Sequence, residues 1–184
     1  MIEIKFYGRG GQGAVVASSI LANAAFKEGR FVQAFPFYGI ERRGAPVAAY
    51  TRIDARPIRQ RGQVRTPSVA IVLDPYFLEV VDVTQGLKPG AIIVLNTGKP
   101  SKDFDFSNQF KVFTCDATAI AVKYSLGTKT QPIVNTAILG AFSKATGLVR
   151  LESIIEAVSE KVTSKIEDNL NAIKEAYDEV KGEM

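Results

Sequence analysis

The sequence predicts an α/β protein built on a doubly wound, mostly parallel sheet, and three observations lead to this class. Short apolar runs alternate with segments of helical periodicity over the first two thirds of the chain. Two of the runs, residues 69–73 and 91–95, are continuously apolar and rich in β-branched side chains, which is typical of strands buried on both faces. A glycine-rich turn joins the first strand to the first helix. We therefore expect a Rossmann-like sheet with helices on both faces and a helical C-terminal third.

The N-terminal part of the chain is predicted to alternate between strands and one helix. Residues 2–6 alternate in polarity and predict a strand, and residues 14–27 carry small and apolar side chains at helical spacing until Gly29. The other elements of this part are a strand at residues 31–35 that Pro36 ends, a strand at residues 47–53, and an exposed hairpin or loop at residues 54–67.

The second part begins with the two buried strands already named. Asp74 and Pro75 open a short helix between them, and residues 111–115 predict a shorter strand after a polar, irregular stretch. Four helices are then expected at residues 117–126, 133–146, 151–162 and 165–181. Because the sequence has no internal repeat, low-complexity tract or linker, residues 1–184 are expected to form a single domain.

The numbers of His and Cys residues exclude several kinds of catalytic and metal chemistry. The 184-residue chain has no His and one Cys, Cys115. Without His there is no Ser-His-Asp or Cys-His relay, no His base and no His metal ligand. A single thiol neither closes an intrachain disulfide nor holds an iron–sulfur cluster, which takes about four thiolates. We expect no catalytic residue and no metal site in this chain, and a Cys115 that is buried rather than reactive.

The location is expected to be cytoplasmic. The start of the sequence lacks the pattern of a signal peptide, and no apolar run approaches the ~18 residues of a membrane span. A lone Cys fits a reducing compartment. No membrane contact is expected.

Arginine is concentrated in one segment of the chain. Residues 41–65 carry an excess of five positive charges, whereas residues 151–184 carry an excess of five negative ones. Guanidinium groups pair bidentately with oxyanions, so the basic segment is expected to meet phosphate, carboxylate or an acidic surface, unless it is only a solvated loop. Nucleic acid is not expected, because no stacking aromatics interleave with the arginines. The arginines are Arg42, Arg43, Arg52, Arg56, Arg59, Arg61 and Arg65.

The turn after the first strand reads Gly8-Arg9-Gly10-Gly11-Gln12-Gly13 and matches G-x-G-x-x-G. Its glycines allow a tight turn and close approach of a ligand to the backbone, and the helix that follows offers unpaired N–H groups to an anion. A dinucleotide site also needs an acidic residue about 20 residues on, and residues 31–36 contain none. Phosphate binding is therefore favoured over a nicotinamide cofactor, and a tight turn without a ligand stays open.

A second unusual stretch, residues 38–46, combines paired arginines with Glu41 and two glycines. One interpretation is a surface loop in which Glu41 pairs with an arginine. The other is an anion-binding or interface loop at the carboxyl edge of the sheet, where ligands of doubly wound folds bind.

The two stretches together resemble one known family. The glycine turn after the first strand, followed by Tyr38-Gly-Ile-Glu-Arg-Arg-Gly44 and a strand reading Ala49-Tyr-Thr-Arg-Ile53, is similar to the gamma subunit of the 2-oxoacid:ferredoxin oxidoreductases. The resemblance covers the whole chain and includes Asn135-Thr-Ala-Ile-Leu-Gly140 and Asn169-Leu-Asn-Ala-Ile173 in the late helices.

The resemblance implies an accessory subunit of an enzyme that oxidatively decarboxylates a 2-oxoacid, forms acyl-coenzyme A and reduces ferredoxin. It implies thiamine diphosphate, Mg and 4Fe-4S clusters on partner chains, namely alpha, beta and a ferredoxin-like delta subunit. For this chain it implies coenzyme A binding and a role in assembly. The Glu-Arg-Arg-Gly and Ala-Tyr-Thr-Arg stretches favour pyruvate or branched-chain oxoacids over 2-oxoglutarate, and of these we favour pyruvate.

Specific residues follow as expectations. The coenzyme A contacts are expected from Gly8, Arg9, Gly10, Gly11, Gln12, Gly13, Arg42 and Arg43. The interface contacts are expected from Tyr38, Gly39, Glu41, Gly44 and Arg52. Two alternatives remain: a scaffold subunit that binds no ligand, and an independent dinucleotide-dependent enzyme.

Overall fold

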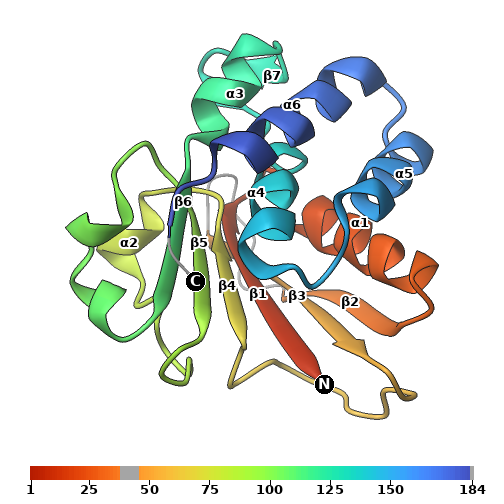
Figure 1. Ribbon diagram of the computed structural model, residues 1–184, viewed down its shortest axis with the longest axis vertical. Helices are drawn as coiled ribbons and strands as arrows, with labels where there is room; N and C mark the ends of the chain where they lie inside the picture. The colour runs from red at the N-terminus through yellow and green to blue at the C-terminus, as the bar shows by residue number, and fades with distance from the viewer. Residues whose placement is uncertain (38–45, 183–184) are drawn as a thin grey trace.

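The computed structural model describes residues 1–37 and 46–182 and centres on a six-stranded sheet of order β2-β3-β1-β4-β5-β6. Strands β1, β4, β5 and β6 run parallel, whereas β3 is antiparallel to both β1 and β2. Figure 1 shows these strands in order from β6 on the left to β2 on the right. The strands are β1 (Ile2–Arg9), β2 (Phe31–Phe37), β3 (Pro46–Asp54), β4 (Val69–Val72), β5 (Ile92–Asn96) and β6 (Lys111–Cys115).

Helices cover the two faces of the sheet unequally. One face packs against the larger hydrophobic core, to which all the long helices contribute. The other face carries a smaller core closed by one short helix and two 3-10 turns, and in Figure 1 this helix, α2, lies at the left, apart from the long helices. The first group is α1 (Ala14–Lys27), α3 (Ala117–Lys123), α4 (Ala137–Thr146), α5 (Leu151–Lys161) and α6 (Ile166–Glu179); the second is α2 (Phe77–Val80), η1 (Ser101–Asp103) and η2 (Asp105–Asn108). The predicted fold class is confirmed.

Several element boundaries differ from the prediction. Strand β2 continues through Pro36 to Phe37, because it is an edge strand of the sheet, where proline is tolerated. The helix expected from residue 133 begins four residues later, at Ala137, and a small hairpin precedes it. This hairpin, β7 (Gly127–Thr128) and β8 (Gln131–Pro132), was not predicted. Among the described residues, no helix has both the length and the apolarity that a membrane crossing requires.

Helix α4 is the central helix of the larger core, and eight of its ten residues are buried. It packs closely against α6 at Gly140. A Cβ atom added to Gly140 would lie 2.9 Å from the carbonyl carbon of Ile173 and closer still to its oxygen. The two helices therefore approach to a distance that admits only a glycine at this position.

Cys115 lies at the end of β6 with 3% of its surface exposed. Its Sγ is 3.8 Å from the carbonyl oxygen of Ala176 in α6. Burial, with smaller contributions from nearby carboxylates, raises the pKa of the Cys115 thiol to about 12. The expected burial of Cys115 is confirmed.

Candidate functional site: a cleft at the carboxyl edge of the sheet

A cleft of about 980 Å³ opens at the carboxyl edge of the parallel strands. Its walls come from the glycine turn after β1, the segment after β4, the end of β5, the start of α3 and the β7–β8 hairpin. The chain leaves β1 towards β2 on one side and leaves β4 towards β5 on the other, so the cleft lies where the winding of the sheet reverses. Ligands of doubly wound folds bind at this point. The lining residues are Arg9, Gly10, Gly11, Gln12, Leu73, Asp74, Pro75, Asn96, Thr118, Lys129, Thr130, Gln131 and Pro132.

The glycine turn uses backbone conformations and close contacts that other residues tolerate poorly. Gly11 and Gly13 have φ values of 98° and 81°, in the left-handed region. A Cβ on Gly13 would lie 2.5 Å from Nδ2 of Asn135, whereas a Cβ on Gly11 would meet nothing within 4 Å. Gly8 faces α1, where a Cβ would lie 3.1 Å from Cβ of Ala14. Gly13 is therefore required for packing, Gly8 packs tightly against α1, and Gly11 opens towards the cleft.

Asp74 fixes the conformation of the glycine turn from the neighbouring strand. One of its carboxylate oxygens accepts hydrogen bonds from Nε of Arg9 and, at 2.7 Å, from Nε2 of Gln12, and the other accepts from the backbone N–H of Tyr76 at 3.0 Å. The Gln12 side chain also accepts from the backbone N–H of Arg9 at 2.8 Å. Asp74 and Gln12 therefore hold the turn in place.

The terminal nitrogens of Arg9 are not used in the bond to Asp74. Only its Nε pairs with Asp74, and 46% of its side chain is exposed beside the ring of Tyr76. The exposed Gly10 and Gly11 have backbone N–H groups without a partner among the described residues. With Lys129 on the hairpin, the charged groups that line the cleft are two cations and one carboxylate. A wall of this composition suits an anion.

The adjoining wall is held by Asn96 at the end of β5. Its Nδ2 donates to the carbonyl of Leu73 at 2.7 Å and to Oγ1 of Thr118 at 2.9 Å, and its Oδ1 accepts from the backbone N–H of Thr118 at 3.0 Å. These bonds link the ends of β4, β5 and α3 below the cleft. The sequence interpretation did not assign Asp74, Asn96 or Lys129 to the site, although a polar residue directly follows each of the apolar runs that form β4 and β5.

We expect Asp74→Ala to lower the free energy of unfolding by about 2 kcal/mol, because it removes three hydrogen bonds at a site where the carboxylate is 5% exposed. Chemical denaturation measures the change. Asp105→Ala, at an exposed position of η2, is the matched control and is expected to change the value by less than about 0.5 kcal/mol. Equal stability of the two variants would show that Asp74 does not hold the turn.

Comparison with known proteins identifies the family. The profile of the family described as "Pyruvate ferredoxin/flavodoxin oxidoreductase" matches residues 3–179. The chain belongs to this family.

The relatives that it matches are oxidoreductase subunits of similar length. The chain is 55% identical over 181 residues to the "Pyruvate/ketoisovalerate oxidoreductases common subunit gamma" of Thermococcus kodakarensis, covering 96% of each chain. It is 52% identical to the "Pyruvate synthase subunit PorC" of Methanothermobacter thermautotrophicus, covering 98% of this chain and 96% of that one. The crystal structure of pyruvate oxidoreductase subunit PORC from Thermotoga maritima superposes with a TM-score of 0.81 at 36% identity, covering 100% and 98% of the two chains. The predicted resemblance to a gamma subunit of a 2-oxoacid oxidoreductase is confirmed.

Not all the predicted residues of this gamma subunit are described by the structure. Tyr38, Gly39, Glu41, Arg42, Arg43 and Gly44 lie outside the described residues. The ends that flank them are described: Phe37 ends β2, and Pro46 pairs with Arg9 in the β1–β3 ladder. The flanks therefore place both ends of this segment at the edge of the sheet that carries the glycine turn.

Arg52 has a different environment from the one expected. Only 2% of its surface is exposed, so its burial does not fit a direct contact with a partner. Nε of Arg52 pairs with Oε1 of Glu3 at 2.8 Å, and the guanidinium lies 5.0 Å from the ring centroid of Phe35. Its terminal nitrogens donate to Gln33 and to three backbone carbonyls of the following loop, Gln60, Gly62 and Gln63. Arg52 therefore holds this loop against the sheet.

Proposed function

We propose that the chain is the gamma subunit of a pyruvate:ferredoxin oxidoreductase complex and that its carboxyl-edge cleft binds the phosphate-bearing part of coenzyme A. The observation that carries the proposal is the glycine turn, with Arg9 and Lys129 gathered at the winding reversal of the sheet. Relatives with these names, more than half identical over nearly the whole chain, support the choice of complex.

The cleft suits coenzyme A in size and chemistry. Its volume of about 980 Å³ lies at the upper end of the range for small-molecule sites. Coenzyme A carries a diphosphate and a 3′-phosphate, which the open backbone at Gly10 and Gly11 and the cations Arg9 and Lys129 are suited to hold. Gln12 is less available for the ligand than expected, because both ends of its side-chain amide are bonded within the turn.

Arg42 and Arg43 belong to the same proposal. They are five to six positions after Phe37, in a segment that ends next to Pro46, the partner of Arg9 in the β1–β3 ladder. We propose that they add cations to the mouth of the cleft, and that Tyr38, Gly39, Glu41 and Gly44 contact a partner subunit there.

The remaining parts of the proposal concern the complex. We propose alpha, beta and ferredoxin-like delta subunits as partners, with thiamine diphosphate, Mg and 4Fe-4S clusters on those chains, ferredoxin as the electron acceptor and the cytoplasm as the location. The residues of this chain fit that division, because its one thiol is buried and no three His, Cys, Asp or Glu side chains gather as a metal site within residues 1–37 and 46–182. Residues 1–184 would act as one gamma-type domain.

The topology weakens the alternative of a dinucleotide-dependent enzyme. In a dinucleotide-binding fold the second parallel strand lies next to the first and ends in the acid that binds the ribose. Here the antiparallel strand β3 separates β2 from β1, and β2 contains no acidic residue. The other alternative is a scaffold subunit that binds no ligand, and an experiment must distinguish it from a subunit that binds coenzyme A.

Binding of coenzyme A to the purified complex tests the proposal. We expect Lys129→Ala and Arg42→Ala each to raise the dissociation constant by about fivefold, and Arg9→Ala by about tenfold, because each removes a charge-assisted bond to phosphate. Isothermal titration calorimetry with coenzyme A measures the change. Lys102→Ala, an exposed lysine outside this cleft, is the control and is expected to leave the constant unchanged.

A double variant shows whether Arg9 acts directly. Arg9→Ala leaves the carboxylate of Asp74 uncompensated, and repulsion by that charge alone would weaken binding. Asp74→Asn removes the charge while keeping a side-chain oxygen that can accept hydrogen bonds in the turn, so if Arg9 contacts phosphate, Arg9→Ala/Asp74→Asn stays as weak as the single variant. Full recovery in the double variant would assign Arg9 a neutralising role, and unchanged affinity in all of the single variants would leave only the scaffold function.

A further inference from the structure

Loop 55–66 forms most of the connection from β3 to β4 and is a positively charged surface that hydrogen bonds hold against the sheet. We propose that it docks the chain onto an acidic face of another subunit of its complex, an inference that rests on the proposed place of the chain in that complex. Four arginines of this loop are exposed, and the loop contains no acidic residue. They are Arg56, Arg59, Arg61 and Arg65.

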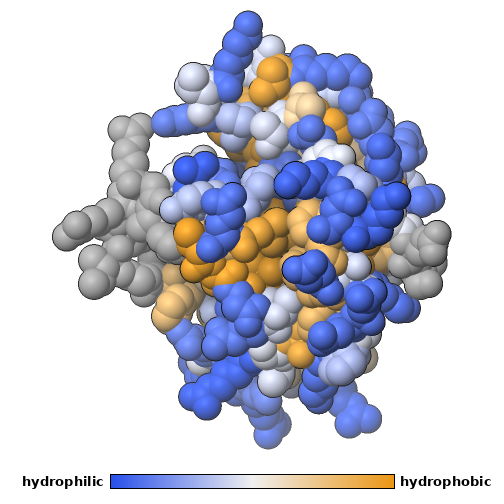
Figure 2. Space-filling model, turned by 90° about the vertical axis from the view of Figure 1, so that its left-hand side faces the viewer, coloured by the Kyte–Doolittle hydropathy of each residue, from blue (hydrophilic) through white to orange (hydrophobic). Residues whose placement is uncertain are grey.

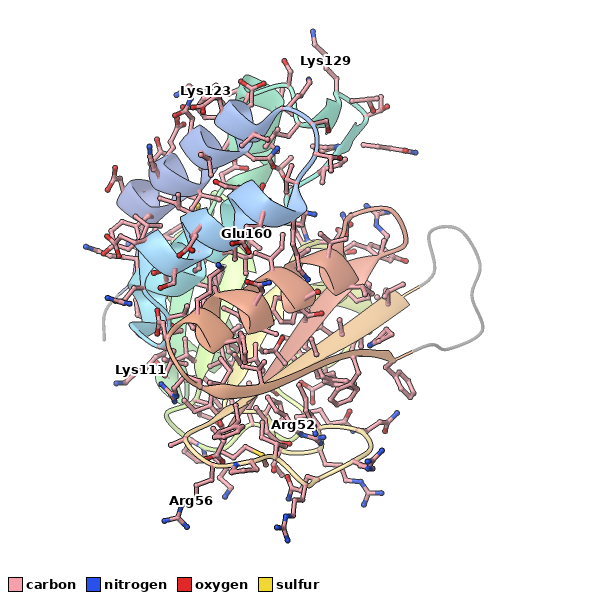
Figure 3. The ribbon with its side chains drawn as sticks, turned by 90° about the vertical axis from the view of Figure 1, so that its right-hand side faces the viewer. Arg52, Arg56, Lys111, Lys123, Lys129 and Glu160 are labelled. Carbon is pink, nitrogen blue, oxygen red and sulfur yellow. The ribbon has the colours of Figure 1, made fainter. Side chains whose placement is uncertain are left out.

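The four arginines are not neutralised within the chain. None of them forms an ion pair with a described residue, whereas Lys27 and Lys123 are paired with carboxylates of α5 and α6. In Figure 3, Arg56 extends away from the body of the molecule, whereas Arg52 lies between the loop and the sheet. Four like charges on twelve residues repel one another, so the loop is favourable in this form only if something holds it in place.

The loop is held by contacts that a solvated, unstructured loop does not have. The five N–H donors of buried Arg52 have five acceptors, three of which are loop carbonyls. Nε2 of Gln33 in β2 donates to the carbonyl of Ile58 at 3.2 Å, and Val64 is buried with 5% of its surface exposed. The arginines are thus presented from a preorganised backbone, which lowers the entropic cost of binding.

The composition of this surface is typical of a protein interface. Phe31, paired with Asp54 at the start of the loop, is 46% exposed on the same face of β2 as Gln33. Arginine and aromatic residues are enriched at protein interfaces, and acidic and lysine residues are depleted. Nucleic acid fits less well, because the loop itself has no aromatic residue for base stacking. Carboxylates on a partner protein complement the guanidinium groups best.

A hydrophobic area on another side of the chain carries no proposal of this kind. Figure 2 shows it at the centre of the face where α2 lies, and α2 exposes Val80 at 49%. Its apolar character does not select a partner.

The test measures retention of the chain in the purified complex at increasing NaCl concentration, by size-exclusion chromatography with mass detection. We expect R56Q/R59Q/R61Q/R65Q to associate at least tenfold more weakly than the wild-type chain at low salt and to lose the salt dependence of binding. The same four positions changed to Lys are expected to recover most of the affinity. K102Q/K111Q, at exposed positions around the opposite edge strand β6, is the control and should match wild type.

The possible outcomes of this experiment separate the docking surface from the proposed function. Retention of the Arg→Gln variant equal to wild type, with both folded by circular dichroism, overturns the docking surface and leaves the proposed function intact. Failure of the wild-type chain to join any partner overturns the proposed function itself. Two further results also overturn the inference: self-association of the full chain that the four substitutions abolish, and binding of duplex DNA that they abolish while retention in the complex is unchanged.

Discussion

We expect Gly140→Ala to lower the free energy of unfolding by about 3 kcal/mol. On helix propensity alone the change would stabilise α4 by about 1 kcal/mol, because alanine is favoured over glycine inside a helix. The contact between the two helices makes the substitution destabilising instead. The added methyl group would overlap the backbone of Ile173, and since this is backbone in the middle of α6, no side-chain rotation relieves the overlap. The two helices must move apart, and the core that they share is buried throughout.

Urea or guanidinium denaturation followed by circular dichroism measures this change. The matched control is Asn171→Ala, an alanine substitution on the exposed face of α6 close to the same contact. It is expected to alter the free energy of unfolding by no more than about 0.5 kcal/mol. A Gly140→Ala protein as stable as wild type would show that α4 and α6 do not pack as closely as described.

The second large effect concerns the reactivity of Cys115. Its thiol, with the pKa raised from 9.0 to about 12, carries about a thousandfold less thiolate near neutral pH than an ordinary cysteine. Iodoacetamide should therefore label native Cys115 at least about a thousandfold more slowly than the same residue in the denatured chain. Mass spectrometry of timed samples measures both rates. Comparable rates in the native and denatured proteins would contradict the burial of Cys115 under α6.

The same group makes stability depend on pH in a defined window. In the unfolded chain Cys115 loses its proton near its ordinary pKa of 9.0, and in the folded chain only near 12. Its contribution to stability is therefore complete below about pH 9 and is lost as the pH rises towards about 12. Cys115→Ala removes this part of the alkaline decline, and an identical decline in both proteins would contradict the assignment.

Local patterns in the sequence predicted most of the elements, because those elements depend on neighbouring residues. Helix α1 has the predicted bounds, since both its periodicity and the Gly29 that stops it are local. The position of β3 between β2 and β1 was not predictable in this way. Its pairing joins residues far apart in the chain, such as Arg9 with Pro46, and no local signal specifies that contact.

The candidate site was predictable in part for the same reason. The glycine turn is a local motif and was recognised, whereas its anchor Asp74 is 65 positions from Arg9. Asp74 was assigned only to the start of a helix, and its second role depends on β1 and β4 lying side by side. For Arg52 the sequence suggested a functional contact at the surface, whereas its role is inside the fold. A charged residue in an Arg-rich segment suggests the surface, and only the fold shows that its donors are satisfied inside.

Strand β3 also sets the distance between the positive charges at the glycine turn and those of loop 55–66. Its first residue, Pro46, pairs with Arg9, and its last residue, Asp54, lies eight positions later and leads into loop 55–66. An extended strand of that length places Arg9, which pairs with the first residue of β3, roughly 27 Å from the start of loop 55–66. Screening at physiological ionic strength reduces a field substantially over about 8 Å. Arg9 in the glycine turn and the start of loop 55–66 are therefore electrostatically independent, and a substitution of Arg56 should leave the affinity of the cleft for its ligand unchanged.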